Sequence, residues 1–236
     1  MSSRRDASRA AIAAVARALG EDRKRVVFVG GTVTALYSLA HGVDVRPTVD
    51  VDAVIDVVTT ADYYAFVEGL RGRGFQECTD EGAPLCRRVC GDIRVDIMAT
   101  ADTGIGPTNR WYRDGVAAAE SYPVAADLEV RAITPLYFVA TKLEAFAGRG
   151  RGDYQASHDL EDVLAVLAGV DTLRSQVETD DSAAGLAVRR SLAELARKDA
   201  FIDAVPGHFE GDAAGQERAD AVVTWLHRLR GSTRLR

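Results

Sequence analysis

The feature that most constrains the fold is a change of hydrophobic pattern along the chain. Up to about residue 134, short runs rich in β-branched residues alternate with stretches of helical periodicity, whereas almost every later segment is helical in pattern. The runs of strand length lie at residues 25–30, 49–58, 85–91, 92–100 and 129–134. The stretches with helical spacing lie at residues 5–19, 32–42, 63–71, 135–149, 157–169, 184–198 and 214–229.

This order of elements predicts an α+β fold, in which a small mixed β-sheet is flanked by helices and a helical C-terminal lobe completes a cleft. The composition shifts after Met98, where the segment TADTGIGPTNR is rich in turn-forming residues. We therefore expect a sheet-bearing core with an N-terminal helix at residues 1–108 and a mainly helical lobe at residues 109–236. Ser157 fits the N-cap of one helix of that lobe.

Composition excludes several classes of protein. The 236 residues are 47% apolar, which is typical of a globular protein, but no uncharged apolar run is long enough for a membrane helix. Arg9 and Arg17 interrupt the apolar stretch near the N-terminus, a pattern typical of an amphipathic helix and not of a signal peptide. The three cysteines match neither a zinc motif nor a disulfide framework. We expect a cytoplasmic protein with no membrane partner.

The charge of the chain is unevenly distributed. A formal net charge of −6 excludes a polycation that coats nucleic acid. The last ten residues, HRLRGSTRLR, nevertheless carry four arginines and no acidic residue. Such a tail could contact RNA or DNA phosphates, or it could be a frayed and solvated terminus.

A glycine pair stands where the first strand passes into the next helix. Free backbone N–H groups at the start of a helix bind anions, and glycine lets phosphate oxygens approach the backbone. Gly30, Gly31 and the hydroxyl of Thr32 are therefore a candidate phosphate site. The alternative is a tight turn with close packing, since the segment matches neither the Rossmann fingerprint nor the P-loop.

Three aspartates on two strand-like runs are candidate metal ligands. Asp50 and Asp52 are two residues apart, so their side chains would share one strand face. Neighbouring carboxylates repel each other unless a cation lies between them, and Mg²⁺ or Mn²⁺ prefers oxygen ligands and binds phosphates. Asp96 is an isolated acid on a later apolar strand, and it would complete the site and accept a proton if the two strands are neighbours. The alternative is a pair of solvated acids at the start of a strand.

Two residues just before this pair are further candidates. Arg46 could form an ion pair with the carboxylates or bind a phosphate. Thr48 falls on the same strand face as Asp50 and Asp52, and its hydroxyl could be modified. The simpler interpretation of Thr48 is a β-branched residue that suits a strand.

Two helices in the second half carry charged residues at functional spacing. Lys142 and Arg149 share a face of the helix predicted at 135–149, so both could point at one anion; the alternative is a solvated face. Asp159 and Asp162 lie near the start of the next helix. The helix dipole stabilises carboxylates there, and that could be their whole role.

Taken in order, these motifs resemble a known family. Gly-Gly-Thr at a strand–helix junction, then R-P-T-V-D-V-D, then V-D-I on a later strand resemble the nucleotidyltransferases of the DNA polymerase β superfamily. The stretch TPLYFVATKLEAFAGRGRGDYQASHDLEDV resembles the lysine–arginine–aspartate motif of AbiEii-type toxin nucleotidyltransferases, the branch that includes the MenT toxins. The resemblance covers residues 25–170, with a longer gap between Gly31 and Asp50 and an unmatched loop at residues 104–107.

The resemblance implies an Mg²⁺-dependent (or Mn²⁺-dependent) enzyme. Such an enzyme transfers NMP from ATP or another NTP to an acceptor hydroxyl, on a tRNA 3′ end or a protein, and could be the toxin partnered by a cognate antitoxin. Two rival hypotheses remain open: a catalytically silent nucleotide-binding module, and transfer to a small molecule such as an aminoglycoside. The basic tail favours RNA, and the acidic net charge is compatible with a cationic small molecule.

The family pattern also implies roles for individual residues. Its metal ligands would be Asp50, Asp52 and Asp96. The candidate nucleotide-binding residues are Gly30, Gly31, Thr32, Arg46, Thr48, Lys142 and Arg149, and the candidate catalytic residues are Asp50, Asp52, Asp96, Lys142 and Asp159. Asp162 is a further acid of the same motif.

Overall fold

The computed structural model of the chain describes residues 2–37, 39, 50–150 and 152–232. Their contacts divide into two compact units. The first unit comprises the described residues of 1–36 and 47–134 and carries the β-sheet. The second comprises the described residues of 37–46 and 135–236 and is helical.

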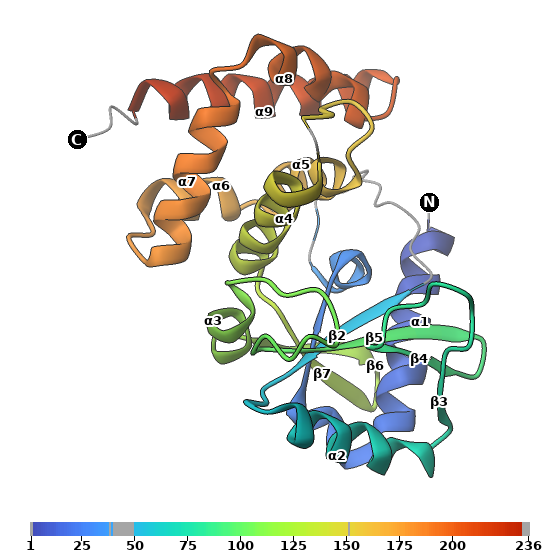
Figure 1. Cartoon of the computed structure of the whole chain (residues 1–236). Helices are drawn as coiled ribbons and strands as arrows, with labels where there is room; N and C mark the ends of the chain where they lie inside the picture. The colour runs from blue at the N-terminus through green and yellow to red at the C-terminus, as the bar shows by residue number, and fades with distance from the viewer. Residues whose placement is uncertain (1, 38, 40–49, 151, 233–236) are drawn as a thin grey trace. The chain divides into compact units, whose positions relative to one another are not determined.

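A mixed sheet forms the centre of the first unit (Figure 1). In the described part of the chain it has seven strands: β1 Val26–Val29, β2 Val51–Ile55, β3 Phe75–Glu77, β4 Arg87–Cys90, β5 Ile93–Ala99, β6 Glu120–Ala125 and β7 Leu128–Ala132. Their order across the sheet is β3-β4-β5-β2-β1-β7-β6. The pairs β1–β7 and β2–β5 are parallel, and the other neighbours are antiparallel. The predicted α+β fold with a mixed sheet is confirmed.

Helices and 3₁₀ turns pack on this sheet. They are α1 Ser2–Leu19, η1 Gly20–Arg25, η2 Gly31–Leu36, α2 Thr60–Arg71 and α3 Tyr112–Ala117. α1 contacts β2, β5 and β6, and α2 contacts β3. Thr59 begins α2 as an N-cap, because its hydroxyl accepts a hydrogen bond from the Asp62 N–H at 3.1 Å. The core between these layers is built from β-branched and aromatic side chains, such as those of β1, all of which are buried.

The helix predicted at residues 32–42 differs from the observed element. Gly31–Leu36 is a 3₁₀ helix, and residues 38 and 40–42 lie outside the described residues. Thr34 explains part of the difference, because its hydroxyl donates a hydrogen bond to the Gly31 carbonyl at 2.7 Å. Such side-chain bonds compete with regular α-helical hydrogen bonding.

The second unit is a set of packed helices (Figure 1). They are α4 Pro135–Arg149, α5 His158–Gly169, α6 Leu173–Thr179, α7 Ala183–Leu195, α8 Asp199–Ala204, η3 Val205–His208 and α9 Ala213–Ser232. α4 contacts α5, α6 and α7, and α9 contacts α5 and α7. The predicted cap of α5 is confirmed, because the Leu160 N–H donates to Ser157 Oγ at 3.3 Å.

The two contact units divide after Thr134, later than the domain boundary predicted after residue 108. The physical reason is the hairpin of β6 and β7, which lies beyond residue 108 and extends the sheet through the pairing of β7 with β1. The domain limits 1–108 and 109–236 stay a prediction. Among the described helices, none combines the length and apolarity needed to cross a membrane.

Candidate functional site

The β4–β5 hairpin determines which side chain faces Asp96. Its turn at Gly91–Asp92 lies where the strand-length runs at residues 85–91 and 92–100 meet, and Gly91 has the positive φ of 60° that such a turn favours. The hairpin register then makes Arg87 the direct cross-strand partner of Asp96. Because side chains alternate along a strand, Arg87 and Asp96 lie on one face of the sheet, and Arg88 lies on the other.

Asp52 and Asp96 lie side by side on that face. The strands β2 and β5 pair in parallel, and the register makes Asp52 the partner of Asp96. Residues at the same register position of paired strands project to the same side of a sheet. The two strands are therefore neighbours. The sequence analysis required this for Asp96 to complete a site with Asp50 and Asp52.

Arg87 connects Asp96 to Asp50. Its Nε and Nη2 each donate to one oxygen of the Asp96 carboxylate at 2.8 Å, and Nη2 lies 3.7 Å from Asp50 Oδ2. The Asp96 side chain is only 13% exposed, so this bidentate pair is largely shielded from solvent. The hydrogen bonds to Asp96 raise the pKa of Arg87 above its ordinary value. Arg87 thus contacts Asp96 and Asp50, and Asp52 is the register partner of Asp96 on the neighbouring strand.

The turn at Gly30 lies directly against Asp52. Gly30 has φ of +71°, and a Cβ atom there would overlap the Asp52 carboxylate. Thr32 Oγ1 in the same turn and Asp50 Oδ1 are both buried, and neither has a hydrogen-bond partner among the described residues. Buried polar atoms are normally hydrogen-bonded, so these two atoms, one in the Gly30 turn and one two residues before Asp52, are typical of a site that receives a polar ligand.

Gly30→Ala is expected to destabilise the protein by at least about 2 kcal/mol, because the positive φ is strained for alanine and the new methyl group displaces Asp52. Urea denaturation measures the loss. The matched control is Gly82→Ala, at φ of +77° with open space around the Cβ position, which carries only the backbone strain. Equal losses for the two variants would contradict the close approach of Gly30 to Asp52.

Two candidate residues cannot be placed. Arg46 and Thr48 lie outside the described residues. Their roles as nucleotide-binding residues therefore stay predictions that rest on their position just before Asp50.

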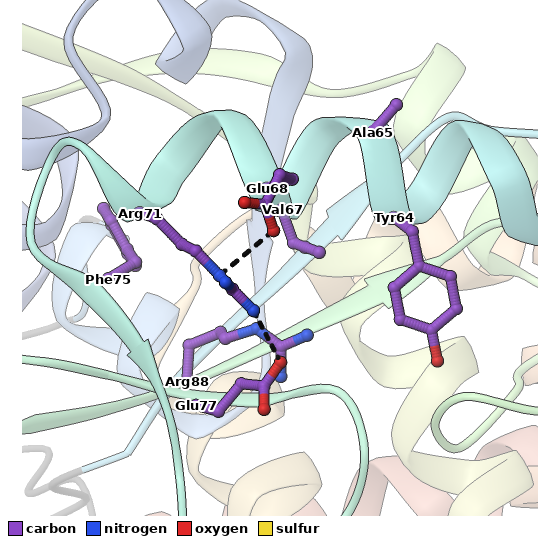
Figure 2. A pocket seen from close by; sticks show the side chains of 8 residues that line it. All are labelled: Tyr64, Ala65, Val67, Glu68, Arg71, Phe75, Glu77 and Arg88. Atoms are coloured by element: carbon purple, nitrogen blue, oxygen red, sulfur yellow. Dashed lines mark hydrogen bonds and ion pairs between the residues drawn. The ribbon is translucent and has the colours of Figure 1, made fainter.

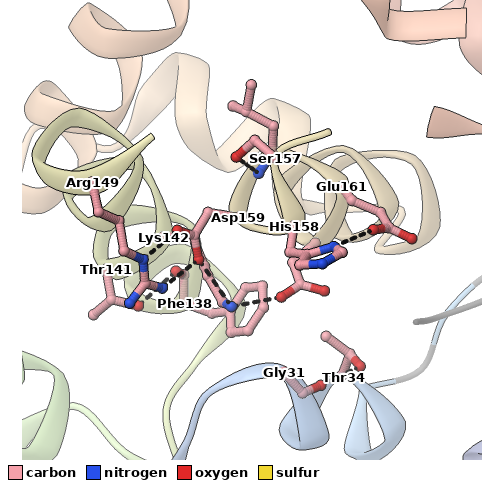
Figure 3. A network of polar contacts seen from close by, with 12 residues as sticks. Gly31, Thr34, Phe138, Thr141, Lys142, Arg149, Ser157, His158, Asp159 and Glu161 are labelled. Carbon is pink, nitrogen blue, oxygen red and sulfur yellow. Dashed lines mark hydrogen bonds and ion pairs between the residues drawn. The ribbon is translucent and has the colours of Figure 1, made fainter. Parts of the chain in front are cut away.

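A second charged cluster lies within the helical unit (Figure 3). Lys142 on α4 lies 3.3 Å from Asp159 Oδ1 and 2.6 Å from Asp162 Oδ2, both on α5. The three side chains are buried, with exposed fractions of 12% for Lys142, 8% for Asp159 and 5% for Asp162. Arg149, about two turns further along the same face of α4, donates through Nε and Nη2 to the same Asp159 carboxylate at 2.9 and 2.8 Å. The anion that Lys142 and Arg149 share within this unit is therefore Asp159.

Two opposing influences set the pKa of Asp159. Burial, the larger influence taken singly, raises the pKa, but the hydrogen bonds from Arg149 and the charge of Lys142 together outweigh it. The pKa of Asp159 is consequently below its ordinary value of 3.8. A carboxylate whose pKa is lowered by folding stabilises the fold above its unfolded pKa, and this stability is lost as the pH falls through the folded pKa.

The free energy of unfolding is therefore expected to fall as the pH is lowered from about 5 to below 3.8. Arg149→Gln removes one cause of the lowered pKa but leaves Asp159 buried, so the pKa of Asp159 rises and the loss of stability toward low pH should become smaller. Urea denaturation at a series of pH values, followed through Trp225 in the same unit, measures the shift. An unchanged pH profile in Arg149→Gln would contradict the pairing.

The three aspartates fit Mg²⁺ in donor chemistry, because carboxylate oxygens are the ligands that this ion prefers. Asp50 Oδ1, which has no hydrogen-bond partner in the described ranges, fits a cation as well. Within residues 2–37, 39, 50–150 and 152–232, however, no cluster of three or more His, Cys, Asp or Glu side chains is spaced to hold a metal ion. The guanidinium of Arg87 instead engages both oxygens of Asp96.

Sequence reasoning missed Arg87, although a signal for it existed. Counting back from a two-residue turn at Gly91–Asp92 places Arg87 opposite Asp96. The position of Asp162 was harder to foresee. Its ion pair with Lys142 joins two helices, and only their packing determines which of the two α5 aspartates is nearer.

Comparisons with known proteins bear on this fold and site. The sequence matches, over residues 13–224, the family described as nucleotidyl transferase AbiEii toxin, type IV TA system. The crystal structure of an antigenic nucleotidyltransferase-like protein from Paracoccidioides brasiliensis is similar in fold, with a TM-score of 0.52 and 15% sequence identity over 84% of this chain and 91% of that chain. The solution structure of the antibiotic-resistance factor ANT(2″)-Ia gives a TM-score of 0.45 and 14% identity over 79% and 91%. The sequence has no match among curated proteins.

Proposed function

This chain belongs to the nucleotidyl transferase AbiEii toxin family of type IV toxin–antitoxin systems, and on that premise we propose its metal, its acceptor and its site residues. The protein is a nucleotidyltransferase with an NTP as substrate, and the family implies a cognate antitoxin. The proposal is that transfer requires Mg²⁺ and that the acceptor is the 3′-terminal hydroxyl of an RNA, with tRNA as the first candidate.

One observation carries the assignment of the site. Asp52 and Asp96 are register partners on the parallel strands β2 and β5, and the Gly30 turn lies directly against the Asp52 carboxylate. This juxtaposition supports a site in which phosphate groups at the turn and a cation at the carboxylates lie next to each other. The buried oxygens of Thr32 and Asp50, which have no hydrogen-bond partner within the described part of the chain, support it further.

The reaction joins the acceptor oxygen to the α-phosphorus and breaks the bond from that phosphorus to the bridging oxygen, so that pyrophosphate leaves. Mg²⁺, when bound by Asp50 and Asp52, would neutralise charge on the triphosphate. The backbone N–H groups of Gly31 and Thr32 would donate to phosphate oxygens. Asp96 would accept the proton of the acceptor hydroxyl after Arg87 has released it, because both of its oxygens otherwise accept hydrogen bonds from Arg87.

Lys142 supplies positive charge for the phosphates in this proposal, and Asp159 holds that lysine. A buried lysine positioned by two carboxylates loses little side-chain freedom when it binds an anion. Arg149, whose side chain is 67% exposed, can exchange Asp159 for a phosphate more easily than Lys142 can. This division of roles follows from burial and from the contacts within the helical unit.

Arg87→Gln is expected to strengthen metal binding about tenfold, because removal of the guanidinium frees both oxygens of Asp96 and lowers the positive charge beside Asp50. Titration with Mn²⁺ followed by electron paramagnetic resonance measures the affinity without any turnover. Arg94→Gln is the matched control, since Arg94 is half-exposed on β5 and pairs with Asp80. Equal or weaker Mn²⁺ binding in Arg87→Gln would contradict competition between arginine and metal.

The test of the proposed function is transfer of label. The protein is incubated with Mg²⁺, total RNA or cell lysate, and each NTP in turn labelled at its α-phosphate. Label on RNA that is lost after removal of the 3′-terminal nucleotide supports the proposal. Label on a protein or on a small hydroxylated compound would refute RNA as acceptor, and transfer that persists in EDTA would refute the role of Mg²⁺.

A further inference from the structure

A pocket on the first unit contains a buried arginine that the proposed reaction does not use. It has a volume of about 360 Å³ and is lined by residues of α2, β3 and β4 (Figure 2). Arg88 reaches it from β4, on the face of the sheet opposite to Arg87 and Asp96. The pocket is therefore separated by the sheet from the candidate metal ligands.

Arg88 has no counter-ion in the described part of the chain. Only 6% of the residue is exposed. Its Nη1 donates to the carbonyl oxygens of Leu85 and Arg87, both at 2.9 Å, and these neutral partners hold the guanidinium in place. Burial of a positive charge without a negative partner is costly, so the site favours any anion that can enter.

The two acids that line the pocket are already paired. Arg71 Nε lies 3.0 Å from Glu68 Oε2, and Arg71 Nη2 lies 3.3 Å from Glu77 Oε1, so one arginine bridges α2 and β3 (Figure 2). Both glutamates are mostly exposed, at 65% and 63%. Their negative charges are balanced by Arg71 and screened by solvent. A ligand deep in the pocket would therefore interact mainly with the positive charge of Arg88.

We propose that this pocket binds a small organic anion, whose carboxylate or phosphate monoester group pairs with Arg88. The guanidinium suits either head group, because both present oxygens to its planar set of donors. The volume exceeds what the head group alone needs and leaves room for an apolar body. Phe75, which is 1% exposed, and Tyr64, which is 48% exposed, supply aromatic surface for that body.

The binding test uses two probes that differ only in the head group, 4-fluorobenzoate and 4-fluorophenyl phosphate. Their affinities for the full chain are measured by ¹⁹F NMR titration, which requires no turnover. Arg88→Gln is expected to weaken the better probe by about tenfold or more, since a charge-assisted hydrogen bond is lost. Arg17→Gln, which removes an exposed arginine paired with Asp127, should leave both affinities unchanged.

The probe that binds more tightly identifies the head group. The proposal is supported if either probe binds detectably and this binding requires Arg88. Binding of neither probe at millimolar concentration, or equal affinity in Arg88→Gln and the wild type, overturns it. An affinity that falls in Thr32→Val and not in Arg88→Gln also overturns it, because the probe then occupies the candidate phosphate site.

A second pair of variants keeps the test valid if Arg88→Gln fails to fold. Tyr64 and Glu77 are both well exposed, so their replacement carries little risk to the core. Tyr64→Ala should weaken binding by removing aromatic surface, and Glu77→Gln should strengthen it by removing a negative charge at the pocket. If the affinity is unchanged in both variants, the proposal is overturned. None of these outcomes depends on nucleotide transfer, so failure here is distinguishable from failure of the proposed function.

Discussion

Asp52→Asn is expected to reduce nucleotide transfer about a thousandfold or more while the protein stays folded. The change keeps the shape of the side chain but removes the charge beside Asp96 and the Gly30 turn. Loss of a metal-held carboxylate costs several kcal/mol of transition-state stabilisation, and about 1.4 kcal/mol corresponds to a factor of ten in rate. Asp50→Ala should have a similar effect. Initial rates of label transfer, at saturating NTP and Mg²⁺, measure both variants.

The matched control is Asp56→Asn, on the same segment of chain just after β2. Asp56 is exposed and accepts a hydrogen bond from Thr100 Oγ1 at 2.7 Å, away from the candidate ligands. Its replacement should leave transfer within about a factor of two of the wild type. Wild-type transfer by Asp52→Asn or Asp50→Ala would defeat the assignment of this site. Circular dichroism and thermal unfolding show whether any loss is one of folding instead.

The second large effect concerns stability. Lys142→Met is expected to lower the free energy of unfolding of the helical unit by about 3–5 kcal/mol, because it leaves the buried carboxylates of Asp159 and Asp162 without their shared cation. Denaturation by urea, followed by the fluorescence of Trp225 in a Trp111→Phe background, reports on this unit alone. Lys198→Met, at an exposed lysine of the same unit, should cost about 0.5 kcal/mol or less.

A combined variant separates the structural role of Lys142 from a role in transfer. Adding Asp159→Asn and Asp162→Asn to Lys142→Met removes both buried carboxylates, of which only Asp159 still pairs with Arg149, so most of the lost stability should return. Transfer should remain lost if Lys142 binds the nucleotide phosphates as proposed. Recovery of transfer together with stability would reduce Lys142 to a structural residue. A Lys142→Met variant as stable as the wild type would contradict the buried ion-pair cluster itself.

Local pattern predicted much of the fold. The hairpin turn at Gly91–Asp92, the cap at Ser157 and the helix α4 all follow from residues within a few positions of one another. The strand β6 was missed, because Glu120–Ala125 contains a proline and exposed polar residues, and it is a strand only through pairing with β7. Short edge strands of this kind carry little hydrophobic signal.

The chain alone determined the order of its elements and the residue types of the site, since periodicity, turns and caps depend on neighbours in sequence. Only the tertiary structure decided which side chains contact each other. Strand register placed Asp52 beside Asp96 and placed Arg87 opposite Asp96. Helix packing placed Lys142 against the carboxylates of both Asp159 and Asp162. Arg88, which has no counter-ion among the described residues, is buried because side chains alternate along β4 and its own side chain lies at the pocket. Apart from the pairing of Arg87 with Asp96, which the short hairpin turn already indicates, these outcomes depend on contacts between residues far apart in the chain, and local preferences carry no information about them.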